Sequence, residues 1–239
     1  MDTLKIGNTK CKIIAHRGLS GLECENTNAA FVAAGNRSYF GIETDVHVTA
    51  DGEFIIIHDN STKRVADVDL EVEKSNYCDL KKLRLYDNID KRLRSDLVLP
   101  DLKEYVRICK KYQKIAVLEL KNPMSEKDIL GILKEISDEE YIENTIIISF
   151  DWDNLVKVKS NLPEQKVQFL TSECDDKLIK KLKVYKMDLD IAYRSVTKEM
   201  VRKLHENNIE INCWTCDNKE DAEELILYGV DYITSNILE

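Results

Sequence analysis

The chain contains the stretch KIIAHRG at residues 12–18, in which a short apolar run is followed by a histidine, an arginine and a glycine. An apolar run that ends in polar residues is typical of a buried strand that leads into a loop. Similar runs occur at residues 41–45, 54–59 and 115–121, and each of them ends in carboxylates, a histidine or a lysine. The pattern therefore predicts several strands whose C-terminal ends carry ionisable side chains.

The rest of the chain alternates between strand-like runs and amphipathic stretches. The predicted strands cover residues 12–16, 41–46, 115–120, 145–150, 166–170, 187–191, 209–214 and 230–234. The predicted helices cover residues 27–37, 102–112, 126–137, 154–161, 175–184, 198–207 and 218–228. Ser125, Asp153 and Thr197 are the expected N-caps of three of these helices.

This alternation predicts parallel strands joined by right-handed crossovers. Eight such units in 239 residues predict an α/β fold, a closed (β/α)8 TIM barrel, which needs roughly 250 residues. The alternative is a doubly wound α/β sheet, but the chain has no GxGxxG motif to support one. Residues 60–99 have no clear strand–helix period, so we expect a single domain over residues 1–239 with a small inserted segment at about 60–99.

A β-hairpin is expected directly after the second strand. Asp51-Gly52 is a strong signal for a two-residue turn. With that turn, residues whose numbers sum to 103 face each other, and Asp45 lies opposite His58 on one face of the hairpin. Glu43, two residues before Asp45, shares this face.

The composition limits the class of partner. A net charge of −9 argues against nucleic acid and against an anionic membrane surface, so we expect a small-molecule ligand and no stable membrane association. The first residues lack the apolar segment of a signal peptide, and no later run approaches the roughly 18 apolar residues of a membrane span. Seven cysteines, an odd number, suggest free thiols in a reducing compartment, and we expect a cytoplasmic protein.

Seven ionisable side chains lie where predicted strands end and loops begin. They are His16, Arg17, Glu43, Asp45, His58, Glu119 and Lys121. Carboxylates bind hard divalent cations, histidines transfer protons near neutral pH, and Arg and Lys bind phosphate oxygens. In a barrel of this type the catalytic groups lie at the C-terminal ends of the strands. Together these groups predict metal-assisted cleavage of a phosphodiester.

Most of the chain resembles the glycerophosphodiester phosphodiesterase family. The resemblance rests on Ala15-His16-Arg17-Gly18, Glu25-Asn26-Thr27, Glu43-Thr44-Asp45-Val46, Thr49-Ala50-Asp51-Gly52, His58-Asp59, Leu99-Pro100-x-Leu102, Glu119-Leu120-Lys121, Ser149-Phe150 and Trp214-Thr215, in this order. It implies a TIM barrel with a small insertion, a divalent cation, and hydrolysis of glycerophosphodiesters such as glycerophosphocholine to glycerol 3-phosphate and an alcohol.

The resemblance also implies roles for single residues. It makes Glu43, Asp45 and Glu119 the metal ligands, and an all-oxygen ligand set suits Mg²⁺ or Ca²⁺. It makes His16 and His58 the acid–base pair, with either histidine suited to either role. Arg17 and Lys121 resemble a phosphate clamp, and Phe150 and Trp214 are expected to line the pocket.

Some positions depart from the family pattern or allow another function. His47 stands where Gln or Lys is common, and we expect an outward-facing hairpin histidine there. Cys213-Trp214-Thr215-Cys216 resembles a redox motif, yet it lies at a strand end where the family has no catalytic cysteine, so we expect no redox or zinc role. Two other functions fit the same site: a phospholipase that acts on lipids with intact acyl chains, and a metal-dependent binding module without catalysis.

Overall fold

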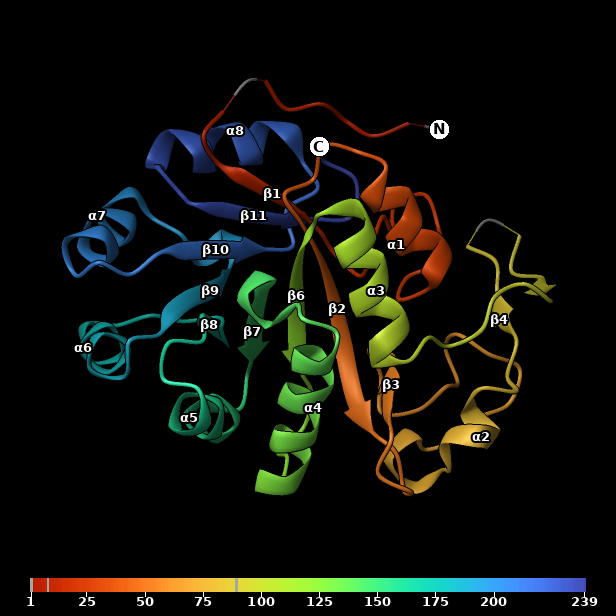
Figure 1. Cartoon of the computed structure of the whole chain (residues 1–239). Helices are drawn as coiled ribbons and strands as arrows, with labels where there is room; N and C mark the ends of the chain where they lie inside the picture. Colours follow the sequence, from red (N-terminus) through yellow and green to blue (C-terminus); the bar gives the residue numbers. More distant parts are fainter. Residues whose placement is uncertain (1, 8, 89) are drawn as a thin grey trace.

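Eight parallel strands close into a barrel in the computed structural model, which describes residues 2–7, 9–88 and 90–239. Figure 1 shows how the labelled strands are arranged. β1 (Lys12–Ala15) pairs with both β2 (Gly41–Val48) and β11 (Tyr232–Ser235), and this double pairing closes the ring. From β2 the ring continues through β6 (Ile115–Leu120), β7 (Thr145–Ser149), β8 (Val167–Thr171), β9 (Asp188–Ala192) and β10 (Ile211–Trp214). The predicted TIM barrel is confirmed, and all eight strands lie within two residues of their expected bounds.

Helices between the strands cover the outside of the barrel (Figure 1). They are α1 (Asn28–Gly35), α3 (Leu102–Tyr112), α4 (Glu126–Asp138), α5 (Trp152–Asn161), α6 (Asp176–Tyr185), α7 (Lys198–Glu206) and α8 (Lys219–Tyr228), with the short 3-10 helices η2 (Ile142–Asn144) and η3 (Tyr193–Ser195). In the described part of the chain no helix is long and apolar enough to cross a membrane.

A helix begins where an N-cap side chain accepts a hydrogen bond from one of the free backbone N–H groups of its first turn. Ser125 and Thr197 cap α4 and α7 as expected. The expected cap Asp153 is wrong, because Asp151 accepts the N–H of Asn154 at 2.9 Å and α5 therefore begins two residues earlier.

The hairpin after β2 has a different register from the expected one. β3 (Phe54–Ile56) pairs with β2 so that Val46 faces Ile56, which gives a sum of 102. Thr49 N–H donates to the carbonyl of Glu53 at 2.8 Å, so the loop has three residues. Of the turn residues only Gly52 has a positive φ, +85°, whereas a type I′ two-residue turn needs a positive φ at both central positions.

This register changes the surroundings of Asp45. The backbone carbonyl of Asp45 accepts the N–H of Ile57 at 3.1 Å, so Ile57 rather than His58 lies opposite it. The expected cross-strand pair of Asp45 and His58 is therefore wrong. His58 follows the end of β3 and reaches the site from the loop beyond that strand.

The segment after β3 folds into a small insertion beside the barrel (Figure 1). It contains η1 (Val72–Lys74), α2 (Tyr77–Leu80) and the short strands β4 (Leu85–Tyr86) and β5 (Leu93–Arg94). Its buried apolar residues form a cluster separate from the main core, and Ile55 and Ile57 belong to this cluster. Because alternate residues of a strand point to opposite faces, β3 joins the segment to the barrel.

Candidate active site

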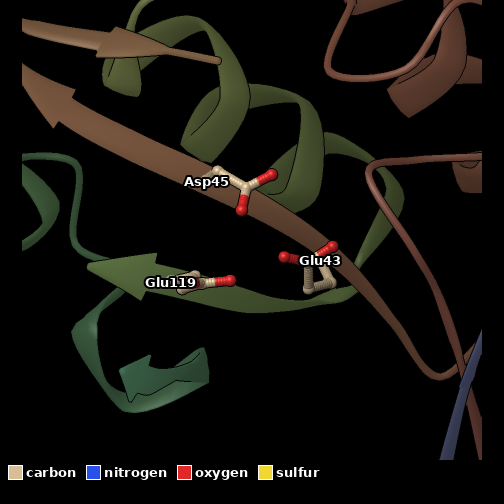
Figure 2. Close-up of side chains that lie close together, drawn as sticks. All are labelled: Glu43, Asp45 and Glu119. Carbon is tan, nitrogen blue, oxygen red and sulfur yellow. The ribbon is translucent and has the colours of Figure 1, made fainter. Parts of the chain in front are cut away.

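Three carboxylates converge between the middle of β2 and the C-terminal end of β6. Asp45 and Glu119 are register partners on these neighbouring strands, and Glu43 lies two residues before Asp45 on the same face. Figure 2 shows the three side chains pointing toward one another, and one oxygen of each lies within 4.8 Å of the others. All three are buried, with exposed fractions of 3% or less for Glu43 and Asp45 and 7% for Glu119.

Burial and mutual repulsion act on these carboxylates. Burial, then Asp45, raises the pKa of Glu119 to about 7, and burial with Asp45 and Glu119 raises the pKa of Glu43 well above its usual range. Burial would also raise the pKa of Asp45, but Lys121 and Arg17 together hold that pKa below its usual value. A bound cation would reduce the repulsion between these three buried carboxylates and favour their ionised forms.

Two cations stand beside the carboxylates. Lys121 Nζ lies 2.8 Å from Glu119 Oε1 and 3.4 Å from Asp45 Oδ1. Arg17 Nε lies 3.6 Å from Asp45 Oδ2, and the backbone N–H of Arg17 donates to Glu43 Oε2 at 2.7 Å. Even so, Asp45 Oδ1 has no hydrogen-bond partner among the described residues, which leaves a buried oxygen available to a ligand.

Asn26 is a site residue to which the sequence assigned no role. Its Nδ2 donates to Asp45 Oδ2 at 2.8 Å, and its Oδ1 accepts the hydroxyl of Thr44 at 2.7 Å. The backbone of Asn26 has a φ of +53°, a left-handed conformation that Asn tolerates better than most residues. The segment Glu25-Asn26-Thr27 contained the signal, but an amide alone does not indicate which side chain it orients.

His16 is held by an amide. Its Nδ1 lies 2.8 Å from Asn236 Oδ1, while Asn236 Nδ2 donates to Asp217 Oδ2 at 2.6 Å. Because the carboxylate of Asp217 can only accept, the amide oxygen of Asn236 must face His16, and Nδ1 of His16 must carry the proton. Burial, then Arg17, lowers the pKa of His16 to about 4, so the ring is neutral at physiological pH with an unprotonated Nε2.

His58 is held by a carboxylate. Its Nδ1 lies 2.7 Å from Asp59 Oδ1. Burial lowers the pKa of His58, while Asp45 and Asp59 oppose this shift. The two histidines therefore have partners of different charge, a neutral amide for His16 and a carboxylate for His58.

Arg64 of the inserted segment links the surroundings of both histidines. It donates to Asp59 Oδ2 at 2.6 Å and to Glu25 Oε2 at 2.7 Å. Glu25 in turn accepts from Arg17 at 2.8 Å. One guanidinium thus orients the partner of His58 and the partner of Arg17 at the same time.

His47 and the cysteine pair lie outside this constellation. His47 is fully buried, with Nδ1 3.0 Å from Glu73 Oε1 and Nε2 3.3 Å from the carbonyl of His58, so the expected outward orientation is wrong. It supports the loop that carries His58. Cys213 and Cys216 are free and buried, and burial raises the pKa of both thiols, which makes them poor nucleophiles.

A cavity of about 110 Å³ brings most of the predicted site residues together. It is lined by His16, Arg17, Glu43, His58, Glu119, Phe150, Trp214 and Thr215, with Ile148, Leu170, Asp190 and Thr234. Phe150 and Trp214 stack edge to face with ring centroids 5.5 Å apart. Lys121 lines an adjoining hollow with Glu119 and Phe150. Asp190 is the one acidic lining residue of the cavity that the sequence had not indicated.

Comparison with known proteins agrees with this geometry. The model of the glycerophosphoryl diester phosphodiesterase family matches residues 16–238. A glycerophosphodiester phosphodiesterase of Caldanaerobacter subterraneus subsp. tengcongensis is 30% identical over 234 residues, covering 95% of this chain and 94% of the relative. A glycerophosphodiester phosphodiesterase of Bacillus subtilis is 28% identical, with 93% and 82% covered.

Two solved structures share the fold over nearly the whole chain. A glycerophosphodiester phosphodiesterase from Parabacteroides distasonis superimposes with a TM-score of 0.81 at 26% identity and covers 96% of this chain and 94% of its own. An Oleispira antarctica phosphodiesterase, solved with the product sn-glycerol-3-phosphate, gives a TM-score of 0.86 at 24% identity and covers 95% and 93%. From the family match, the relatives and the barrel, we conclude that the protein is a phosphodiester hydrolase of the glycerophosphoryl diester phosphodiesterase family.

Proposed function

We propose that the protein hydrolyses water-soluble glycerophosphodiesters to sn-glycerol 3-phosphate and an alcohol, with a divalent cation and with His16 and His58 as acid–base groups. The observation that carries this proposal is the cluster of Glu43, Asp45 and Glu119, whose oxygens lie within 4.8 Å of one another beside a cavity that both histidines line. The product seen with the Oleispira antarctica protein supports the choice of substrate class.

Glu43, Asp45 and Glu119 would hold the cation. Three carboxylates without a nitrogen or sulfur ligand suit Mg²⁺ or Ca²⁺ better than zinc. Asp45 Oδ1, which accepts no hydrogen bond from the described residues, and the raised pKa values of Glu43 and Glu119 fit such an ion. When bound, the ion supplies positive charge that stabilises the negative charge developing on the phosphoryl oxygens.

The histidine partners suggest which ring is the base. His16 is neutral, and its Nδ1–H donates a hydrogen bond to Asn236 Oδ1, so the unprotonated Nε2 can accept the proton of the attacking hydroxyl. Burial lowers the pKa of His58, but the carboxylates of Asp45 and Asp59 oppose this shift and favour the protonated ring. We propose that His58 donates a proton to the leaving alcohol oxygen. We therefore assign the base to His16 and the acid to His58.

Arg17 and Lys121 are proposed to bind the phosphate. Arg17 lines the cavity, and Lys121 stands at its edge beside Glu119. Burial lowers the pKa of Lys121, but Asp45 and Glu119 raise it more, which keeps the ammonium charged. Local cations of this kind are needed because the net charge of −9 repels a phosphate anion at long range. Phe150 and Trp214 are proposed to pack against the substrate.

We further propose that residues 1–239 act as one domain with an insertion at about residues 60–99. The apolar cluster of this insertion packs on Ile55 of β3 and on Ile57 directly after it, which supports this view. A cytoplasmic location is proposed because the seven cysteines are free.

The test is an assay of purified protein with glycerophosphocholine, with and without a chelator, in which release of sn-glycerol 3-phosphate is measured. We expect EDTA to abolish the activity and excess Mg²⁺ or Ca²⁺ to restore it. Unchanged activity after exhaustive EDTA treatment would contradict the metal requirement. Hydrolysis of intact phospholipid but not of glycerophosphocholine would point to a phospholipase, and metal binding without turnover would point to a binding module.

A further inference from the structure

Asp190 lies in the middle of β9, four strands from β2 around the ring and therefore on the wall of the barrel that faces the metal-site carboxylates. Its neighbours Leu189 and Ile191 pack into the main hydrophobic core. Because alternate residues of a strand point to opposite faces, Asp190 points into the barrel. Its side chain is 1% exposed and lines the same cavity as Glu43 and Glu119.

The hydrogen bonding of Asp190 is incomplete. Asn212 Nδ2 donates to Asp190 Oδ2 at 3.1 Å, whereas Asp190 Oδ1 has no partner among the described residues. The buried indole N–H of Trp214, which lines the same cavity, also has no partner in the described part of the chain. Buried polar atoms are nearly always bonded, so two unpaired ones in one cavity indicate a polar ligand or ordered water there.

The chemistry of the two unpaired atoms, Asp190 Oδ1 and Trp214 Nε1, indicates that the ligand is a hydroxyl group. Asp190 does not belong to the group of three carboxylates whose oxygens lie within 4.8 Å of one another, so it is separate from the proposed metal ligands. Burial, then Glu119, raises the pKa of Asp190 well above its usual range, which favours a neutral carboxyl. An indole N–H donates only, and a hydroxyl can accept from it while bonding to a carboxyl oxygen.

The cavity also limits the size of the ligand. A volume of about 110 Å³ corresponds to roughly three or four water molecules at about 30 Å³ each. A three-carbon polyol fits this space. Ile148 and Leu170 on the cavity wall can pack against the carbon atoms of the polyol, and Asp190 and Trp214 can form hydrogen bonds with its hydroxyls.

We infer that Asp190 and the indole N–H of Trp214 form a subsite for a hydroxyl of the glyceryl half of the substrate, and that Asp190 selects glyceryl phosphates over phosphates without hydroxyls. The inference rests on the proposed function for the identity of the ligand. Asp190 would be a specificity-determining residue that takes no part in proton transfer.

The experiment compares the binding of sn-glycerol 3-phosphate and n-propyl phosphate, which has the same phosphate and carbon chain without hydroxyls. Affinities are measured by calorimetry on the full chain in the presence of Mg²⁺. We expect the wild type to bind glycerol 3-phosphate at least about tenfold more tightly, because propyl phosphate leaves buried polar groups unpaired. In Asp190→Leu, which keeps the shape and removes the polar atoms, we expect this ratio to fall below about threefold.

Two further variants separate the subsite from a structural role. Asp190→Asn keeps a hydrogen-bonding group and should retain more of the preference than Asp190→Leu. Asp188→Asn makes the same exchange two residues earlier on β9, at the other end of the barrel, and should keep the wild-type ratio. Both ligands bind the same folded protein, so a loss of stability alone does not change the ratio of their affinities.

A wild-type ratio below about threefold would overturn the inference even if Asp190→Leu does not fold, and so would an unchanged ratio in Asp190→Leu. The glycerophosphocholine assay tests the proposed function separately. If the ratio depends on Asp190 but no diester is cleaved, the subsite stands and the proposed function fails. If the diester is cleaved and the ratio does not depend on Asp190, only the subsite is wrong.

Discussion

The imidazole Nδ1 of His16 lies 2.8 Å from the amide oxygen of Asn236. An amide oxygen fixes the tautomer of the ring without adding the negative charge that would favour its protonated form. The other histidine of the site has the carboxylate of Asp59 in the same position, at 2.7 Å. The difference between an amide partner and a carboxylate partner is the structural basis for assigning different roles to the two rings.

Asn236→Asp combined with Asp217→Asn should move the acid limb of the pH–rate profile to higher pH. The second change gives the new carboxylate a donor, because Asp217 accepts from Asn236 Nδ2 at 2.6 Å in the wild type. A base loses activity as the pH falls through its pKa, and the pKa of His16 is lowered to about 4 in the wild type. A carboxylate beside the ring favours the protonated form, so we expect the limb to rise by about one pH unit or more. The profile of kcat/KM and an NMR titration of His16 would measure this shift. Asn144→Asp, on the exposed turn before β7, is the matched control, and an equal profile for both variants would speak against the base assignment.

The metal site and the proton-transfer groups should respond differently to mutation. We expect Glu43→Gln and Glu119→Gln mainly to weaken metal binding measured by calorimetry. We expect His16→Ala and His58→Ala to lower turnover by roughly 10²–10⁴-fold each while metal binding is largely kept. Glu143→Gln, at an exposed position, serves as the control. Histidine variants whose rates stay within about tenfold of the wild type would refute the acid–base roles.

The metal-free protein should lose stability as the pH rises from about 4.5 to about 7. Burial and Asp45 raise the pKa of Glu119 from 4.5 to about 7, so the folded state binds more protons than the unfolded state in this window and is stabilised at its acid end. Mg²⁺ should therefore raise the melting temperature more at pH 8 than at pH 5, where protons compete with it. Thermal unfolding at both pH values checks this. Glu119→Gln should reduce the difference, and an equal shift at both pH values would count against the site.

Arg64→Met should lower activity although Arg64 lies outside the cavity. Its guanidinium orients Asp59, the partner of His58, and Glu25, the partner of Arg17. Without it we expect kcat to fall by roughly tenfold or more, because small displacements of catalytic groups are costly. Arg84→Met removes the same charge from an exposed arginine of the same segment that contacts only backbone carbonyls among the described residues. Equal rates for the two variants would show that Arg64 has no positioning role.

The barrel could be predicted from the sequence because each of its strands and helices has a recognisable pattern within a short stretch of residues. Strand-like runs and amphipathic stretches alternate, and this pattern marks parallel strands and covering helices one unit at a time. Asp45 and Glu119 could be placed together for the same reason, since groups at the C-terminal ends of barrel strands meet on one face. The ionisable groups at those strand ends can therefore be identified from the sequence alone.

The remaining features depend on contacts between distant segments. Asn236 reaches His16 across 220 positions, and no local pattern indicates that pairing. The expected hairpin register is wrong because Asp-Gly fits either a two-residue or a three-residue loop, and the backbone of Asp51, which has no positive φ, decides between them. Asp190 was missed because a single aspartate in a strand carries no sign of what it faces. The sequence by itself thus determined the barrel and its ionisable strand ends, while the tertiary structure decided the partner of His16 and the buried position of Asp190, since these depend on which distant groups share a buried space.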